Sequence, residues 1–388
     1  MTAQAQKTAT VIAGIPSGNM TLYHRIRFSV GDPAACIEFQ GQGEDGTLLI
    51  LRDIEMDRAR THARVDTVAC PADFTPEGGL SGNRELATAQ ALAECLCRKG
   101  VTKVVADRSL ALVYVQEMTA RGIEVACDLD LGITQRRCKD EEEIASLASA
   151  QAATERAMKM ACETIARAEV AADGTLVHEG ETLTSQRVRA LIDMQLIGEG
   201  YAAPPSIVAC GSQASDCHEI GDGPLRTGAS VIVDIFPRSN ATLYNGDCTR
   251  TVVHGSIPKE IAAMHAAVVE AKAAAEEATR AGVTAQSVHE ATIAVIRAHG
   301  FDVGLPGTDA PAEYAAMVHG TGHGVGLEVH EPPLLDFGGG ELVVGDALTI
   351  EPGIYSRAFG GVRVEDMVIV TEAGSRNLNT LPEGLDWS

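Results

Sequence analysis

Residues 319–333 read HGTGHGVGLEVHEPP, and this stretch decides how the rest of the chain is interpreted. It carries histidines at 319, 323 and 330 and four glycines between residues 320 and 326. Glycines at this density let the backbone approach another group closely and disfavour a helix. The stretch lacks both the GxGxxG register and the lysine of a phosphate-binding loop, whereas histidines in such a loop suit metal binding or proton transfer. We therefore expect the chemistry of the protein to centre here.

Size and charge restrict the class of protein. The chain has 388 residues, enough for two domains that each bury a core. Its 45% hydrophobic and 22% charged residues are typical of an ordinary globular protein. A net charge of −22 excludes nucleic acid and anionic membrane surfaces as expected partners.

The cysteines and the N-terminus indicate a cytoplasmic protein. Ten cysteines are scattered without the spacing of a zinc knuckle, and several lie in apolar runs as reduced core thiols do. The apolar run at 10–15 is too short for a secretion signal or a membrane span. We expect residues 1–21 to be a loose leader.

Alternating strand and helix patterns occupy residues 22–132. The expected strands are 47–52, 101–106 and 123–126, with a helix that Asn83 caps and another helix at 109–120. This order predicts a smaller α/β N-terminal domain with parallel strands. Residues 133–140 are charged and nearly free of large apolar side chains, so we expect a linker there.

Residues 141–388 form the larger expected domain, of the α+β class. We expect helices at 141–168, 184–197, 258–281 and 285–299, and strands at 206–209, 230–235, 249–254, 343–350, 362–364 and 367–371. The pattern indicates a curved antiparallel sheet with flanking helices. Two helix-then-strand halves, about 141–255 and 257–371, look like weak echoes of each other.

Four acidic residues stand at the ends of otherwise apolar strands: Asp234, Asp247, Glu351 and Glu365. A lone carboxylate in such a place is costly, so four of them require a common partner. Together with His323 they make a hard, oxygen-rich ligand set, closer to manganese, cobalt or iron than to sulfur-rich zinc sites. Four carboxylates and one shared hydroxide nearly balance two divalent cations.

This ordered set, with GHGVGLEVHEPP at 322–333, TIEPGIY at 349–355 and GGVRVED at 360–366, resembles the pita-bread metallopeptidases. That family includes prolidase, aminopeptidase P and methionine aminopeptidase. Residues 22–132 resemble the creatinase-type N-terminal domain, which favours the prolidase and aminopeptidase P branch. The resemblance covers the chain from about residue 22 to its end. It implies a pita-bread catalytic domain and a homodimeric exopeptidase that hydrolyses Xaa-Pro bonds of dipeptides or short peptides.

The resemblance also implies a role for each metal ligand. Asp234 matches a ligand of one cation, while Asp247 and Glu365 match the carboxylates that bridge two cations. His323 and Glu351 match the ligands of the other cation. Two divalent metal ions are thus expected, with manganese first and cobalt, zinc or iron as alternatives.

Further residues match the catalytic and substrate-side positions of the family. Glu351 is placed like the proton shuttle, and His330 like the histidine that steadies the tetrahedral intermediate. His218 stands where the family keeps a histidine near the scissile nitrogen. His319 and Arg363 resemble substrate-side groups of the members that cleave Xaa-Pro bonds.

Two segments depart from the family pattern. The spacing between Asp234 and Asp247 is two residues longer than usual, in a hairpin that can absorb an insertion. The insertion alters the expected pocket rim, where Arg238 could reach the substrate. The segment CGSQASDCHEI at 210–220, which contains His218, also matches imperfectly.

Other functions stay open at this point. A non-peptide hydrolase or a metal-dependent lyase could use the same creatinase-like architecture, and a binding module could keep the pocket without the metals. The motifs do not separate dipeptide from longer-peptide substrates. The remaining histidines (24, 62, 178, 254, 265, 289 and 299) are expected to be surface or helix residues.

Overall fold

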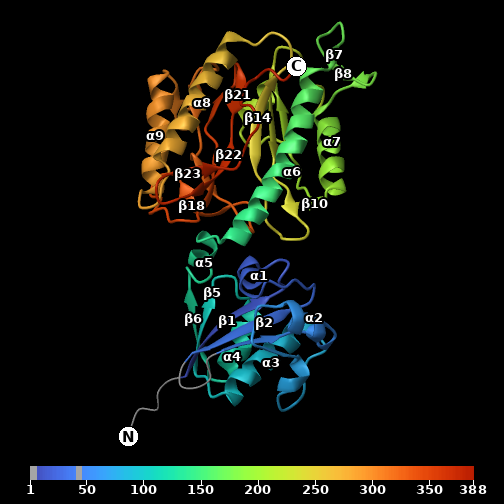
Figure 1. Ribbon diagram of the computed structural model, residues 1–388, viewed down its shortest axis with the longest axis vertical. Helices are drawn as coiled ribbons and strands as arrows, with labels where there is room; N and C mark the ends of the chain where they lie inside the picture. The colour runs from blue at the N-terminus through green and yellow to red at the C-terminus, as the bar shows by residue number, and fades with distance from the viewer. Residues whose placement is uncertain (1–6, 41–45) are drawn as a thin grey trace. The chain divides into compact units, whose positions relative to one another are not determined.

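The computed structural model describes residues 7–40 and 46–388 of the chain, which divides into two compact units (Figure 1). The units are Met1–Arg136 and Arg137–Ser388. Their boundary falls inside the segment 133–140, where we expected a linker, and this segment contains the short helix α5, Ile133–Arg137. Among the described residues, none of the helices has the length and hydropathy that crossing a membrane requires.

The N-terminal unit is built on a six-stranded sheet in the order β4-β3-β2-β1-β5-β6. The strands are β1 Thr8–Gly14, β2 Ala34–Gln40, β3 Gly46–Ile50, β4 Thr67–Ala69, β5 Lys103–Asp107 and β6 Glu124–Asp128. The helices are α1 Met20–Ile26, α2 Met56–His62, α3 Arg84–Arg98 and α4 Leu112–Ala120, with short 3-10 turns at Asp53–Glu55 and Pro71–Phe74. Helix α3 begins as predicted, because the Asn83 side chain accepts a hydrogen bond from the Leu86 N–H.

Two expectations about this unit are wrong. The sheet is mixed, since β2 pairs antiparallel with both β1 and β3, while the other pairings are parallel. Residues 8–21 do not form a loose leader: Thr8–Gly14 is a central strand whose inner residues are buried, and helix α1 follows it. An apolar run too short to be a signal peptide is long enough for a central strand, which is apolar on both faces. Residues 1–6 lie outside the described residues.

Four long helices flank the strands of the C-terminal unit, α6 Glu141–Ala166, α7 Ser185–Gly198, α8 Lys259–Ala278 and α9 Ala285–Ala298. Figure 1 shows α6 and α7 on one side of the strands and α8 and α9 on the other. Helix α6 starts at a capping box in which Asp140 and Glu143 exchange side-chain to backbone hydrogen bonds. The first and last residues of these four helices agree with the predicted bounds to within a few residues.

Short strands form the interior of this unit. The first half contributes the sheet β11-β12-β14, made of Ile207–Cys210, Ser230–Ile235 and Cys248–Val253. The second half contributes the sheet β18-β17-β19-β22-β23, made of Glu331–Leu335, Gly322–Gly324, Ala347–Ile350, Asp366–Val370 and Ser375–Asn377. It also contributes the sheet β15-β16-β20-β21, made of Asp302–Val303, Ala315–Met317, Gly353–Ser356 and Gly360–Arg363. All pairings are antiparallel as expected except β15 with β16.

Smaller elements complete the C-terminal unit. These are β7 Glu169–Val170, β8 Leu176–His178, β9 Glu181–Thr182, β10 Tyr201–Ala202, β13 Arg238–Ser239 and the 3-10 turn η3 Gly211–Ser215. The hydrogen bonding divides the strands into separate sheets, whereas we expected one curved sheet.

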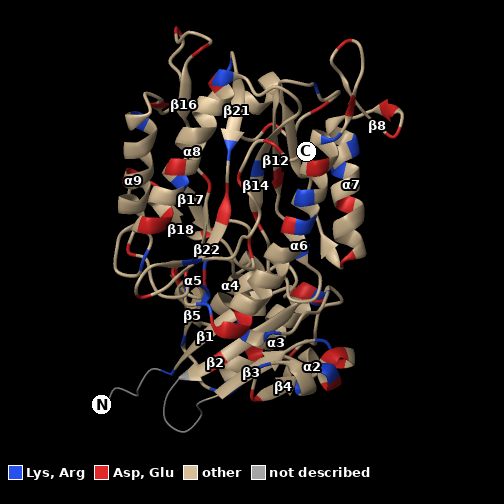
Figure 2. Cartoon of the chain, turned by 45° about the horizontal axis from the view of Figure 1, so that its top comes forward, with Lys and Arg blue, Asp and Glu red and all other residues tan. Residues whose placement is uncertain are grey.

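A buried cluster of charges lies among these strands. Arg250 on β14 is fully buried and donates to Asp366 Oδ1 at 2.8 Å, while Lys272 on α8 pairs with Asp366 Oδ2. Asn377 donates to the same Oδ2, and a second guanidinium nitrogen of Arg250 donates to the carbonyl of Glu365 at 2.7 Å. Figure 2 shows charged residues on the strands that lie between α6 and α8, as well as on the helices. Asp366 thus holds β14, α8 and β22 together through two buried cations.

Replacing Asp366 with asparagine is expected to lower the free energy of unfolding by about 3–5 kcal/mol, because buried cations lose their partner. Urea unfolding followed by the fluorescence of the single tryptophan, Trp387, which packs in the core of this unit, measures the change. Glu181→Gln is the control, since the Glu181 side chain is 75% exposed. Equal stability of the two variants would contradict the role assigned to Asp366.

Candidate metal centre

Five predicted ligands that lie on strands or directly beside them surround one cavity of about 300 Å³. Asp234 lies near the end of β12, and Asp247 immediately precedes the antiparallel neighbour β14. His323 is the middle residue of β17, and Glu351 follows β19. Glu365 lies between β21 and β22. The two helix-then-strand halves therefore each supply part of the site.

The ligand atoms lie close together. One ligand atom each from Asp247, His323 and Glu365 fall within 4.8 Å of one another, and all three residues are buried. His323 Nε2 lies 3.3 Å from Glu351 Oε1 and 3.8 Å from Asp247 Oδ2. These separations are of the kind that a shared cation can span.

The donor set fits divalent cations. Asp234 Oδ1 is buried, and no hydrogen-bond partner for it is found among the described residues. The Nδ1–H of His323 donates to the Gly324 carbonyl at 3.1 Å, which leaves Nε2 with its lone pair toward the carboxylates, as metal-binding histidines require. The Thr249 hydroxyl donates to Glu365 Oε2 at 2.7 Å and orients that carboxylate.

Without cations the carboxylates repel one another. Burial raises the pKa of Asp247 well above its usual range, and the charges of Asp234 and Glu351 raise it further. Burial also raises the pKa of Glu365 and Glu351, and neighbouring carboxylates add to the rise of the Glu365 pKa. The cluster is therefore costly unless positive charge enters it.

Arg363 and His319 line the cavity, but their polar atoms are held by the protein. Arg363 is buried; it donates to Asp234 Oδ2 at 2.6 Å, to the Tyr355 hydroxyl at 2.9 Å and to the Cys217 carbonyl at 3.2 Å. The Tyr355 hydroxyl in turn donates to His319 Nε2 at 2.7 Å, and His319 Nδ1–H donates to the Gly320 carbonyl. Burial lowers the pKa of His319, so the ring is neutral near pH 7. These contacts make Arg363 and, through Tyr355, His319 supports of Asp234, and the substrate-side role expected for both residues stays a prediction.

Tyr355 was not among the predicted site residues. It lies at the end of TIEPGIY, four residues after Glu351, so a signal was present in a motif already in use. Nothing in the sequence alone distinguishes a tyrosine that packs in β20 from one that joins Arg363 to His319.

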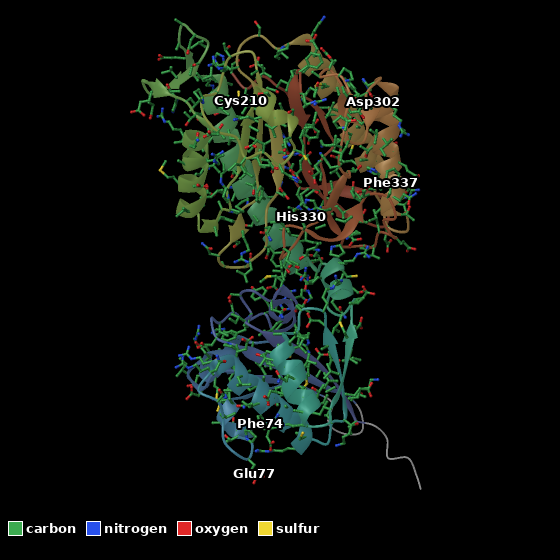
Figure 3. The ribbon with its side chains drawn as sticks, turned by 180° about the vertical axis from the view of Figure 1, so that it is seen from behind. Phe74, Glu77, Cys210, Asp302, His330 and Phe337 are labelled. Carbon is green, nitrogen blue, oxygen red and sulfur yellow. The ribbon has the colours of Figure 1, made fainter. Side chains whose placement is uncertain are left out.

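The two remaining histidines also line the cavity. His330, labelled in Figure 3, is exposed and lies immediately before β18. Its ring centroid lies 4.3 Å from that of His323. The pKa of His330 is lowered, first because part of its ring is buried and second because the His323 ring lies beside it. His218 is exposed just after η3, and its backbone N–H donates to Asp216 Oδ1. The imidazoles are thus available to a bound molecule, unlike that of His319.

The hairpin with the two extra residues does not bring Arg238 to the cavity. Arg238 forms β13 and pairs with Ala202 on β10, and Phe236 is the residue of this segment that lines the cavity. Residues of this longer hairpin pair with the neighbouring strand β10. The number of residues between Asp234 and Asp247 could not predict that pairing.

The glycines of the histidine-rich segment have a steric cause. A Cβ on Gly322 would lie 2.0 Å from the carbonyl oxygen of Thr349 on β19, which no side chain tolerates. A Cβ on Gly324 would lie 2.6 Å from the carbonyl oxygens of Glu331 and Pro332. Glycine on both sides of His323 therefore lets β17 approach its neighbours closely.

Comparison with known proteins agrees with this geometry. The sequence pattern of metallopeptidase family M24 matches residues 145–372. A probable dipeptidase PepE of Mycobacterium tuberculosis is 35% identical over 288 residues, which cover 74% of this chain and 70% of that protein. Xaa-Pro aminopeptidase 1 of Streptomyces coelicolor is 30% identical over 275 residues, which cover 65% of this chain and 53% of that protein.

The fold is shared with solved structures. Prolidase from Pyrococcus furiosus superposes with a TM-score of 0.76 at 24% identity, over 96% of each chain. The predicted pita-bread fold, with its smaller domain ahead of the larger one, is therefore confirmed.

Removal of metal is expected to lower the melting temperature. A cation that binds only the folded state stabilises it by about 2.7 kcal/mol at a hundredfold excess over its dissociation constant. Differential scanning calorimetry with a divalent metal and with a chelator measures the difference, and Glu365→Gln should shrink it. Identical melting with and without chelator would contradict a shared cation site.

Proposed function

This chain belongs to metallopeptidase family M24, as its motifs predicted, and on that premise we propose that it is an exopeptidase that hydrolyses the bond between an N-terminal residue and a following proline. The observation that carries the proposal is the convergence of Asp234, Asp247, His323, Glu351 and Glu365 on one cavity. A histidine and four carboxylates at the wall of a cleft suit hydrolysis assisted by metal ions.

These five residues would hold two divalent cations, and we propose manganese as the native metal, with cobalt, zinc or iron as alternatives. Bound cations supply Lewis acidity toward the substrate carbonyl and lower the pKa of water. The oxygen-rich ligand set supports this proposal.

Glu351 moves the proton. Its carboxylate is half-buried in the cavity, with Oε1 lying 3.3 Å from His323 Nε2. We propose that it accepts a proton from the attacking water and passes it to the nitrogen of the leaving proline. Transfer by one positioned carboxylate contributes typically about 10²–10⁴-fold to the rate.

His330 and His218 act on the substrate. A neutral His330 ring presents an N–H that donates to the carbonyl oxygen as negative charge develops on it. We propose that His218 contacts the substrate on the side of the scissile nitrogen. Their imidazoles at the cavity wall, near His323 in the case of His330, support these roles.

A proline-specific enzyme fits this kind of site for a chemical reason. The nitrogen of an Xaa-Pro bond carries no hydrogen, and the ring bends the chain, so general peptidases handle the bond poorly.

We also propose a homodimer in the cytoplasm. All ten cysteines are free thiols, which supports a reducing compartment, and twofold dimers are the commonest soluble oligomers. Cell fractionation tests the location, and sedimentation velocity tests the dimer.

A metal-dependent lyase on the same architecture is the second candidate, and the altered segment between Asp234 and Asp247 keeps it open. Release of acrylate would favour the lyase, whereas release of sarcosine would indicate a non-peptide hydrolase on this architecture.

The purified protein with added manganese is expected to release alanine from Ala-Pro-Ala-Ala or Ala-Pro, or from both. Chromatographic detection of free alanine measures the reaction, with Ala-Ala-Ala-Ala as the control peptide. Failure to cleave any Xaa-Pro bond would refute the proposed function.

Two histidines in one segment are expected to behave differently when replaced by alanine. His323→Ala removes the only nitrogen ligand, so metal content and turnover should fall together. His330→Ala should retain the metal and keep KM within a few-fold, while kcat falls by about a hundredfold, because one oxyanion donor is typically worth roughly 3 kcal/mol.

Metal analysis and steady-state kinetics on the two variants decide the matter. Loss of metal from His330→Ala with retention in His323→Ala would reverse the assignment. An unchanged kcat per folded molecule in His330→Ala would make that residue merely structural.

A further inference from the structure

One wall of the cavity is built by the end of β18 and the residues that follow it. Leu334 and Asp336 both line the cavity there. Leu334 lies opposite His323 in the β17–β18 pairing, and 56% of its surface is exposed. Asp336 packs against Gly320, since a Cβ on that glycine would lie 3.3 Å from the Asp336 side chain. The wall therefore offers an apolar side chain and a carboxylate beside the metal centre.

The carboxylate of Asp336 is held in place by the Phe337 backbone N–H and by His289. Its Oδ1 accepts the Phe337 N–H at 2.7 Å and lies 3.4 Å from His289 Nε2. His289, on α9, is buried and hydrogen-bonded through Nδ1 to the Thr321 hydroxyl at 2.9 Å, with Phe337 against its ring edge. Figure 3 shows Phe337 beside this helix. His289 is a helix residue as expected, and its contact with Asp336 was not predicted.

No lysine or arginine pairs with Asp336 among the described residues, and 46% of its side chain is exposed to solvent. Burial lowers the pKa of His289, so that ring is neutral near pH 7. Among the cavity-lining residues that the structure describes, the permanent cation is Arg363, and its guanidinium is committed to Asp234, Tyr355 and Cys217. Metal cations would be offset by their own ligands. A substrate carboxylate at this wall would meet a like charge and an apolar surface.

We infer that Leu334 and Asp336 make the site select peptides in which the proline carbonyl is joined to a further residue, and discriminate against dipeptides with a free proline carboxylate. A carboxylate that loses water without gaining a donor binds poorly, and a neighbouring like charge weakens binding further. An amide carbonyl carries no charge and avoids both costs. This inference rests on the proposed function and makes it an aminopeptidase rather than a dipeptidase.

The test compares Ala-Pro with Ala-prolinamide, which differ at the carboxyl group alone. Wild-type protein loaded with manganese is expected to show a kcat/KM at least about tenfold higher for the amide, through KM. Leu334→Arg should raise the ratio of kcat/KM for Ala-Pro to kcat/KM for Ala-prolinamide by about tenfold, because the new guanidinium pairs with the carboxylate and not with the neutral amide. Asp336→Asn should raise Ala-Pro hydrolysis a few-fold.

Leu305→Arg is the matched control, because Leu305 is 79% exposed and lies outside the cavity lining. It adds the same charge and should change neither substrate. Melting curves verify that all variants are folded. Equal or better cleavage of Ala-Pro by wild type, with no gain from Leu334→Arg, would overturn the inference while leaving the proposed function intact. Failure to cleave either substrate would overturn both.

Discussion

Four carboxylates converge on one buried cavity, and their mutual repulsion is the constraint on which the rest of the C-terminal unit depends. Two like charges about 4 Å apart repel by roughly 4 kcal/mol at an effective dielectric constant of 20. Burial is the largest cause of the raised pKa values of Asp247 and Glu365, and repulsion by neighbouring carboxylates adds to it. Only a rigid surrounding can hold such groups in place until cations relieve them. Arg363 offsets part of the charge through Asp234, and the Thr249 hydroxyl restrains Glu365.

Rigidity comes from placing each candidate ligand on a strand or directly beside one. Antiparallel pairing of β12 with β14 fixes Asp234 relative to Asp247, and glycines around His323 let β17 approach β19. The backbone of Glu365 is held by Arg250, which donates a hydrogen bond to the Glu365 carbonyl. Arg250 is itself held by its hydrogen bond to the Asp366 carboxylate. The buried cations Arg250 and Lys272 thus support the metal centre from within the core. A site on strands is held more precisely than one on loops.

The cavity wall formed by Leu334 and Asp336 is built from other elements than the candidate ligands. The candidate ligands lie on or directly beside β12, β14, β17, β19 and β22, whereas Leu334 and Asp336 lie at the end of β18 and in the glycine-containing segment after it. His289 and Phe337 fix this segment to α9 without involving the ligands. Reaction chemistry and substrate selection are therefore carried by separate elements, and changes in the wall can alter specificity while the metal centre stays the same.

The sequence by itself determined most of the elements and the candidate metal ligands. Helix α3 was predicted from its Asn83 cap and α6 from its periodicity, and β12 was predicted from its apolar run. The ligands could be identified because a charged residue at the end of a buried strand is an exception visible in the sequence. Tertiary structure alone decided the partners of these residues. Arg363 and Asp234 are 129 residues apart, as the hydrogen bond between them records, and no local pattern joins them. The run 8–14 became a central strand instead of a leader because its burial depends on β2 and β5, which lie far along the chain. Local propensity and exceptions to it are written in short stretches of sequence, whereas burial and pairing are properties of which distant segments meet.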